Sequence, residues 1–139
     1  MCALECVDLK KAVKSAIVLY ALIFTFASAL MFYVPSAAYD YAALVAVALL
    51  TFMVAKHYFR EYKPANPICS GLALGVVFAV VMFVLDVPLM VYGFASYLGW
   101  SYFASASQML GYVLTIVMPV LAAKMVWGRT AGKARRRRR

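Results

Sequence analysis

Charged and reactive side chains are scarce in this chain. Its 139 residues include a single histidine and only five acidic residues. No nucleophile–base pair, phosphate-binding loop or pair of neighbouring carboxylates can be recognised, so the usual parts of an active site are missing. We therefore expect a protein that is not an enzyme and that carries no cofactor.

Cysteine is also rare, and the odd number of three argues against a disulfide framework. On the topology derived below, Cys2, Cys6 and Cys69 all face the cytoplasm, where conditions keep thiols reduced. Together with His57 they are of the types that bind zinc or copper. Their spacing is a weak match to metal-ligand patterns, so reduced thiols are the simpler interpretation and no metal site is predicted.

Hydrophobic residues, in contrast, are abundant. They make up 67% of the chain, and the mean hydropathy is +0.88. Soluble domains are nearer half apolar, and a chain this short has too little interior to bury so many large side chains. Contact with lipid explains the excess. We therefore predict an all-α integral membrane protein, a four-helix bundle without a separate soluble domain.

Four apolar runs are long enough to cross a bilayer as helices. The expected spans are at about residues 15–34, 37–59, 68–91 and 107–127. They form one transmembrane domain, 15–127, between an N-terminal tail, 1–14, and a basic C-terminal tail, 128–139. Residues 92–106 carry six aromatic side chains and no charge, which is typical of an interfacial lip rather than of a fifth span.

The first span has a second interpretation. Lysines, an apolar stretch and then Ala27-Ser28-Ala29 resemble a cleavable signal peptide. The apolar run continues to Val34, however, which is longer than the core of a signal peptide usually is. We therefore expect an uncleaved span.

All 14 lysine and arginine residues lie at the edges of the apolar runs, and with four spans they all fall on one side of the membrane. Such an asymmetry places that side in the cytoplasm, so we expect a cell-membrane protein with both termini cytoplasmic. Anionic lipid headgroups attract each nearby basic residue by about 1 kcal/mol, which favours lipid over nucleic acid as the partner of the C-terminal tail. The residues of this predicted lipid contact are Lys133, Arg135, Arg136, Arg137, Arg138 and Arg139.

One acidic residue lies inside an apolar run. Asp86 is the only charged residue between Gly71 and Gly93. A helix of this length places it in the outer third of the membrane, where a carboxylate is costly unless it faces the interior of the bundle. Asp86 is therefore the best candidate for a functional group, as a binding site for a proton or a cation. The alternative is a hydrated carboxylate that caps the helix where Pro88 interrupts it.

Polar residues of the fourth span lie at a similar depth. Gln108 and Thr115 could each donate a hydrogen bond to Asp86, and Tyr112 lies between them in the sequence. No basic residue lies at that depth, so an ion pair within one chain is not expected. The predicted polar intramembrane site consists of Asp86, Gln108 and Thr115.

Small residues indicate helix faces that pack closely. Gly71, Gly75 and Ala79 share the helical face of Asp86, and Gly111 lies on the polar face of the fourth span. Small side chains let two helices approach each other. The pattern does not identify the partner, because packing within the chain, a homo-oligomer and a larger membrane complex fit it equally well.

Residues 68–126 resemble small four-span prokaryotic membrane proteins of uncharacterised function. In that family the third span opens with spaced glycines, reaches a Leu-Asp pair and then a Val-Pro pair, and an aromatic outer loop follows. The matching residues here are Gly71, Gly75, Leu85, Asp86, Val87 and Pro88. The resemblance implies a fold and no activity.

Two kinds of function remain open. The sequence slightly favours a non-catalytic accessory or scaffold protein that assembles through its small-residue helix faces, because one acid without a recognisable substrate pocket is weak evidence for transport. The alternative is a small, oligomeric, transporter-like protein that binds a proton or a cationic solute at Asp86.

Overall fold

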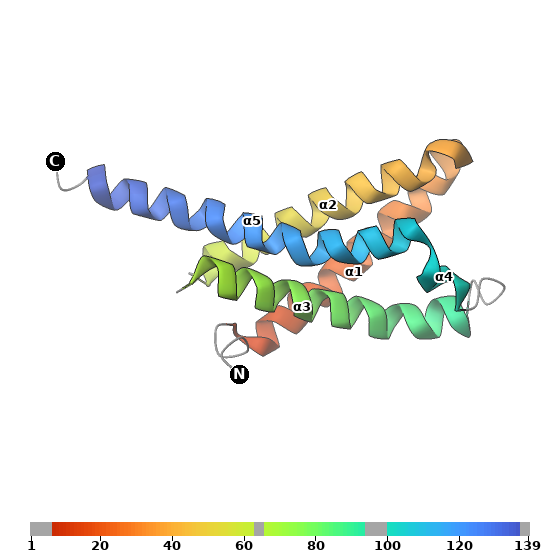
Figure 1. The fold of residues 1–139 in the computed structure, drawn as a ribbon, viewed down its shortest axis with the longest axis horizontal. Helices are drawn as coiled ribbons and strands as arrows, with labels where there is room; N and C mark the ends of the chain where they lie inside the picture. The colour runs from red at the N-terminus through yellow and green to blue at the C-terminus, as the bar shows by residue number, and fades with distance from the viewer. Residues whose placement is uncertain (1–6, 63–65, 94–99, 137–139) are drawn as a thin grey trace.

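The fold is taken from a computed structural model that describes residues 7–62, 66–93 and 100–136. Every regular element in these ranges is a helix, which confirms the all-α prediction (Figure 1). In chain order the elements are α1 (Leu9–Tyr33), α2 (Ser36–Glu61), α3 (Pro67–Asp86), a π-helical segment η1 (Val87–Val91), α4 (Ser101–Ala104) and α5 (Ala106–Arg136).

Four helices of the described ranges are long and apolar enough to cross a membrane, as predicted. Their apolar segments are Leu9–Tyr33, Ala38–Glu61, Pro67–Met90 and Ala106–Gly128. The short helix α4 lies within the aromatic segment that precedes the fourth of them. The chain is therefore built as a multi-pass membrane protein would be.

The helices begin where capping groups allow it. The side chain of Asp8 accepts a hydrogen bond from the backbone N–H of Lys11 at 3.3 Å, which satisfies a free amide of the first turn. Helix α1 therefore includes the lysines up to Lys14, ahead of the expected apolar span. Asn66 caps α3 in the same way, and Pro67 occupies the first turn, where its missing amide is harmless.

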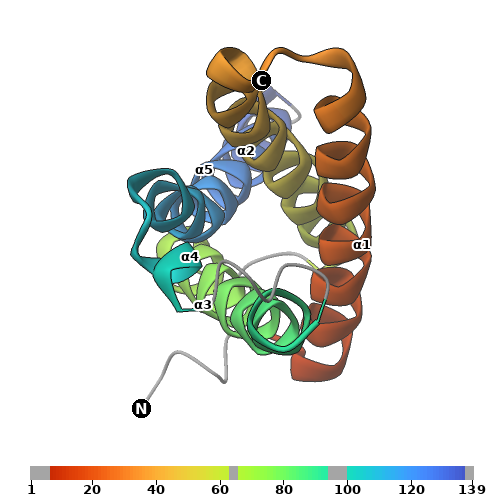
Figure 2. The same ribbon diagram turned by 90° about the vertical axis from the view of Figure 1, so that its right-hand side faces the viewer.

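The four long helices form a ring in which each contacts two neighbours. Helix α5 packs against α2 and α3, and α1 packs against the same two helices, so α1 and α5 lie diagonally across the bundle (Figure 2). Figure 1 shows the start of α1 and the end of α5 at one end of the bundle, with α4 and the α1–α2 turn at the other. The basic residues of α1, α2 and α5 therefore gather at the end that holds the start of α1.

Helix α5 continues well past its apolar segment. Its backbone is helical to Arg136, and it projects beyond the other helices (Figure 1). Part of the predicted basic tail thus belongs to this helix, including Lys133 and Arg135, whereas residues 137–139 lie outside the described ranges. Contact of these side chains with lipid stays a prediction.

Two glycines allow α3 and α5 to touch backbone to backbone. A Cβ atom added to Gly71 would lie 2.6 Å from the Cα of Val120, and one added to Gly75 would lie 2.6 Å from the carbonyl oxygen of Ile116. Real Cβ atoms essentially never come so close to backbone. The close approach that these glycines predicted therefore occurs within the chain.

The other two predicted packing residues behave differently. Ala79 is only half-buried. Gly111 makes no close approach at all, because a Cβ atom placed there would have no atom within 4 Å. The prediction that Gly111 lies in a close helix contact is corrected: a small residue permits close packing, but only the neighbouring helix decides whether it happens.

Buried side chains are concentrated in one half of the bundle, which we call the packed half. It comprises the starts of α1 and α3, the end of α2 and the middle of α5, and its largest fully buried side chains include Phe59, Phe78, Leu19 and Leu74. In the remaining half, here the open half, fewer residues are buried, among them Met82 and Asp86 of α3 and Thr115 of α5, which borders the packed half. Fully buried side chains are therefore sparse in the open half.

Candidate polar site at Asp86

Asp86 is the last residue of α3 and lies inside the bundle. Its side chain is 4% exposed. Pro88 follows it and has no backbone N–H, so the ordinary α-helical ladder cannot continue there. The chain instead widens into the π-helical turn η1, from Val87 to Val91. Sequence reasoning anticipated an interruption at Pro88; the structure shows a widened turn, which is frequent at functional sites.

Three neutral groups from two other helices donate hydrogen bonds to the Asp86 carboxylate. The hydroxyl of Tyr20 in α1 donates to Oδ1 at 2.9 Å, and the hydroxyl of Tyr112 in α5 donates to Oδ2 at 2.6 Å. The amide Nε2 of Gln108, also in α5, donates to Oδ2 at the longer distance of 3.5 Å. One carboxylate therefore links the diagonal helices α1 and α5 through α3.

Of the two donors predicted from sequence, one is found at the carboxylate and the other is not. Gln108 lies there, as expected. The hydroxyl of Thr115 instead lies 2.9 Å from the carbonyl oxygen of Gly111 in its own helix and 3.8 Å from the sulfur of Met82. Thr115 lies about one helical turn further along α5 than Tyr112, which does reach Asp86. Its hydroxyl bonds the carbonyl four residues earlier, as threonine hydroxyls within a helix readily do.

The two closest donors, Tyr20 and Tyr112, were not assigned by sequence reasoning. A signal for both existed: each is a tyrosine well inside an apolar run, and a buried tyrosine hydroxyl usually finds a hydrogen-bond partner. For Tyr112 the spacing from Gln108 also indicated a shared helix face. For Tyr20, no pattern shows that α1 lies beside the end of α3.

No basic residue of the described ranges balances the charge of Asp86. All lysines and arginines of α1, α2 and α5 lie on segments of the packed half or beyond it. In the open half the other acidic residue is Asp40, which is exposed near the start of α2. The Asp86 carboxylate is thus buried among neutral donors without a counter-ion from this part of the chain.

Two further tyrosines belong to this half of the bundle. Burial raises the pKa of Tyr102, in α4; the Asp86 carboxylate and Tyr39 raise it further, and a hydrogen bond with Gln108 opposes the shift. Tyr39, in α2, donates a hydrogen bond to the carbonyl oxygen of Ala27 at 3.4 Å. Tyrosines from α1 and α5 therefore contact the end of α3, and tyrosines from α2 and α4 lie in the same half of the bundle.

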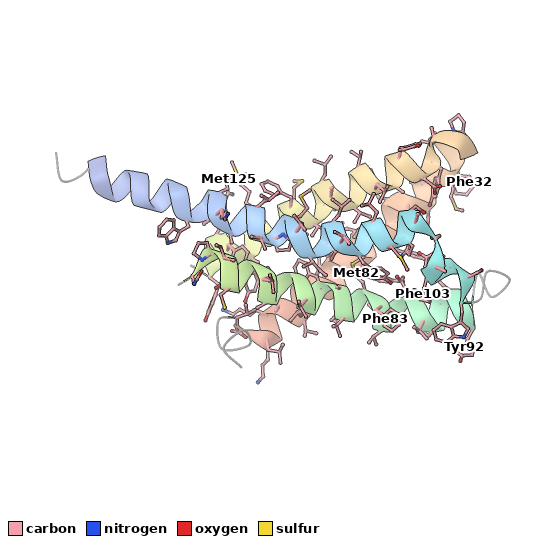
Figure 3. The ribbon with its side chains drawn as sticks, in the orientation of Figure 1. Phe32, Met82, Phe83, Tyr92, Phe103 and Met125 are labelled. Atoms are coloured by element: carbon pink, nitrogen blue, oxygen red, sulfur yellow. The ribbon has the colours of Figure 1, made fainter. Side chains whose placement is uncertain are left out.

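Aromatic rings extend this cluster toward the end of the bundle. The ring of Tyr102 meets that of Phe103 edge-on at 5.3 Å, and Phe103 packs against Phe83 of α3 at 5.2 Å and against Trp100 at 6.0 Å. Figure 3 shows Phe103 and Phe83 side by side at this end, with Met82 further along α3 toward the middle. One ring contact, between Phe103 and Phe83, therefore joins the short helix α4 to α3.

The described residues offer no ready metal centre. They contain no cluster of three or more histidine, cysteine, aspartate or glutamate side chains that could hold a metal ion. The Nε2 atom of His57 lies 3.6 Å from Oε1 of Glu61, in the packed half. Cys2 and Cys6, which sequence reasoning considered as ligands, lie outside the described ranges.

The chemistry available at Asp86 is therefore acid–base or electrostatic. An ionised carboxylate accepts hydrogen bonds only, and the two hydroxyls and the amide satisfy it. When a proton binds, a tyrosine hydroxyl can rotate and accept from it, since a hydroxyl both donates and accepts. A proton can therefore bind the carboxylate while its hydrogen bonds to the hydroxyls are kept.

Comparison with known proteins adds no relative: no family model, no curated protein and no solved structure matches this chain.

Proposed function

We propose that this multi-pass membrane protein is a small transporter-like protein that binds a proton or a cationic solute at Asp86. The observation that carries the proposal is a carboxylate 4% exposed within an apolar helix bundle, with hydrogen bonds from Tyr20, Tyr112 and Gln108 and no basic partner among the described residues. We infer a functional rather than a structural role, because burying an unpaired carboxylate in a membrane bundle costs free energy.

Physical magnitudes support this inference. An aspartate at the centre of a transmembrane helix costs about 3 kcal/mol even on the lenient insertion scale, and in the outer third, where Asp86 lies, the cost is smaller but still unfavourable. Hydrogen bonds to a charged group offset part of this, at about 2 kcal/mol each, but an asparagine would keep most of the shape without burying a charge. Binding of a proton or a cation at Asp86 would remove this electrostatic cost, which supports a binding role for the carboxylate.

The asymmetry of the bundle suggests the route to this site. Large side chains fill the packed half, whereas few residues of the open half are buried. If the basic end faces the cytoplasm, as the positive-inside rule indicates, the open half faces outward. We propose that the protein lies in the cell membrane with both termini in the cytoplasm. Solutes then reach Asp86 from outside the cell.

The accessory or scaffold function is the second candidate. Gly71 and Gly75 already contact the backbone of α5, so assembly through those glycines would compete with the packing of the chain itself. One surface does favour a partner helix: a shallow apolar hollow of about 400 Å³ lies between α1 and α2. Its lining residues include Phe26, Leu30, Ala42 and Ala46.

The experiment that tests the proposal is a flux assay in liposomes that contain the full chain. A pH-sensitive dye inside the liposomes reports proton movement, and Asp86→Asn is compared with Asp40→Asn, the exposed acid of the same half. We expect Asp86→Asn to abolish the flux and Asp40→Asn to leave it intact. Equal flux in wild type and Asp86→Asn, with both folded, would rule out the proposed role.

A further inference from the structure

We propose that Asp86 binds a proton and no larger cation, and that the proton is held on its Oδ1 atom. This inference rests on the proposed function, because it takes Asp86 as the binding group of a transporter-like protein. It goes further in two respects. It chooses between a proton and a cationic solute, and it assigns the atom that carries the proton.

The hydrogen bonds at the carboxylate leave one position open. An ionised carboxylate can accept about four hydrogen bonds, two on each of its oxygens. Both positions of Oδ2 are used, by the hydroxyl of Tyr112 at 2.6 Å and by the amide Nε2 of Gln108 at 3.5 Å. Oδ1 accepts from one described group, the hydroxyl of Tyr20 at 2.9 Å. The open position therefore lies on Oδ1.

The chemical nature of the partners favours the same oxygen. A hydroxyl both donates and accepts, so Tyr20 can turn and accept a hydrogen bond once Oδ1 carries a proton. The amide nitrogen of Gln108 only donates, so it could not accept from a proton placed on Oδ2. Protonation at Oδ1 therefore keeps both hydrogen bonds to Oδ2 and changes at most the one to Tyr20.

The binding step forms a single covalent bond. A hydronium ion gives its proton to Oδ1 and becomes water, while the carboxylate becomes a neutral carboxylic acid. Oδ2 is then the carbonyl oxygen of that acid and still accepts from Tyr112 and Gln108. Release is the same step in reverse. The charge that is costly inside a membrane is absent for as long as the proton stays bound.

A larger cation finds too few free ligands at this site. The side chain of Asp86 is 4% exposed, and three neutral groups already donate to it. A metal ion or an ammonium group in contact with both oxygens would have to displace these donors. Calcium takes about six to eight oxygen ligands, and magnesium requires a near-ideal octahedron. A proton needs one lone pair.

The other titratable groups around α3 do not compete for this proton. Helix α1 presents Tyr20 to the carboxylate and α5 presents Tyr112. The segment η1 has no titratable side chain, and the short helix α4 adds Tyr102. Tyrosine hydroxyls in water lose their protons only near pH 10. Among these groups, Asp86 is therefore the one that changes charge at or below neutral pH.

Infrared spectroscopy of the full chain in liposomes tests the choice of a proton. A protonated carboxyl has a carbonyl band that an ionised carboxylate lacks, and the band that disappears in Asp86→Asn belongs to Asp86. Its height is followed as the pH falls. In separate titrations sodium and tetramethylammonium replace a bulky reference cation, N-methylglucamine, at constant ionic strength.

We expect the same midpoint of the titration in all three cations. A cation that bound the ionised carboxylate would compete with the proton, and each tenfold rise in its concentration above Kd would lower the midpoint by about one pH unit. A midpoint that falls as sodium or tetramethylammonium is raised overturns the choice of a proton over a larger cation.

The frequency of the same band assigns the oxygen. Hydrogen bonds to a carbonyl oxygen weaken the C=O bond and lower its stretching frequency. If the proton is on Oδ1, Tyr112→Phe removes a bond to the carbonyl oxygen Oδ2 and should raise the frequency. Tyr20→Phe, the matched loss of one hydroxyl, should change it less. Any result in which Tyr112→Phe does not shift the band more than Tyr20→Phe overturns the assignment to Oδ1.

These measurements also separate the inference from the proposed function, which is judged by flux. If a cation lowers the midpoint while Asp86→Asn abolishes flux, the solute class is wrong and the binding role of Asp86 stands. If the midpoint ignores the cations but flux persists in Asp86→Asn, the proton binds as inferred and the proposed function fails. If Asp86 shows no protonated band at any pH at which the chain stays folded, the inference fails whatever the flux.

Discussion

The contact of Gly75 with α5 leads to a prediction whose size can be worked from the structure. In Gly75→Ala, the added Cβ atom would lie 2.6 Å from the carbonyl oxygen and 2.8 Å from the Cα of Ile116, where ordinary contacts are 3.4–4 Å. Both atoms are backbone, so no side chain can rotate away and the helices must separate. Overpacking of this kind costs about 1–3 kcal/mol.

Gly111→Ala is the matched control. It makes the same chemical change in the middle of a helix, but its Cβ atom meets nothing within 4 Å. Both substitutions gain about 1 kcal/mol of intrinsic helix propensity, and this gain cancels when the two variants are compared. We therefore expect Gly75→Ala to be less stable than Gly111→Ala by about 1–3 kcal/mol.

The assay is unfolding in mixed micelles, with sodium dodecyl sulfate as the denaturant and helix content followed by circular dichroism. A lower midpoint for Gly75→Ala than for Gly111→Ala is the expected result. Equal midpoints would refute the reasoning, because they would mean that α3 and α5 do not meet at Gly75. A lower midpoint only for Gly111→Ala would place the close helix contact elsewhere on α5.

Three further outcomes are expected. Tyr112→Phe removes the shortest hydrogen bond to Asp86, 2.6 Å, and should lower the free energy of unfolding by about 2 kcal/mol in the same assay; a loss no greater than that of Tyr41→Phe, an exposed tyrosine, would contradict this. Asn66→Ala removes the cap of α3 and should cost about 1 kcal/mol, while Asn66→Ser should restore most of it. Deletion of residues 133–139 should weaken binding to anionic vesicles and leave helix content of the rest unchanged; unchanged vesicle binding would exclude the tail as the lipid contact.

Much of the architecture follows from sequence because lipid imposes strong rules. Spans must be long and apolar and must satisfy their own backbone, so four helices can be located from hydropathy and length alone. The predicted helix ends were less accurate. Helix α1 starts at Leu9 and not near residue 15, because the Asp8 cap, and not the apolar pattern, sets its first turn. The interruption at Pro88 was predictable, but the widened π turn was not.

The site could be predicted only in part. Asp86 is conspicuous as a lone charge in an apolar run. Gln108 could be predicted as its partner from its similar depth in the membrane alone. Tyr20 was not found, because its role depends on α1 lying beside α3, and helix adjacency is not encoded in any single helix. Thr115 shows the opposite error: depth suggested a partner for Asp86, but the hydroxyl bonds the carbonyl of Gly111 in its own helix.

The same limitation applies to the packing glycines. Gly71, Gly75 and Gly111 look alike as small residues on helix faces, yet the first two contact α5 and the third meets no other helix closely. Small residues on one helix face show where close packing is possible. Whether close packing occurs there depends on where the neighbouring helices lie.

The central claim is that Asp86 serves binding and not the stability of the fold. The most direct test is the unfolding free energy of Asp86→Asn against wild type and Asp40→Asn. The side chain of asparagine keeps the size and can still bond Tyr20, Tyr112 and Gln108, while the uncompensated charge disappears. We predict that Asp86→Asn is at least as stable as wild type although it no longer binds; a loss of more than about 1 kcal/mol, the size expected for a structural cap, would contradict the account.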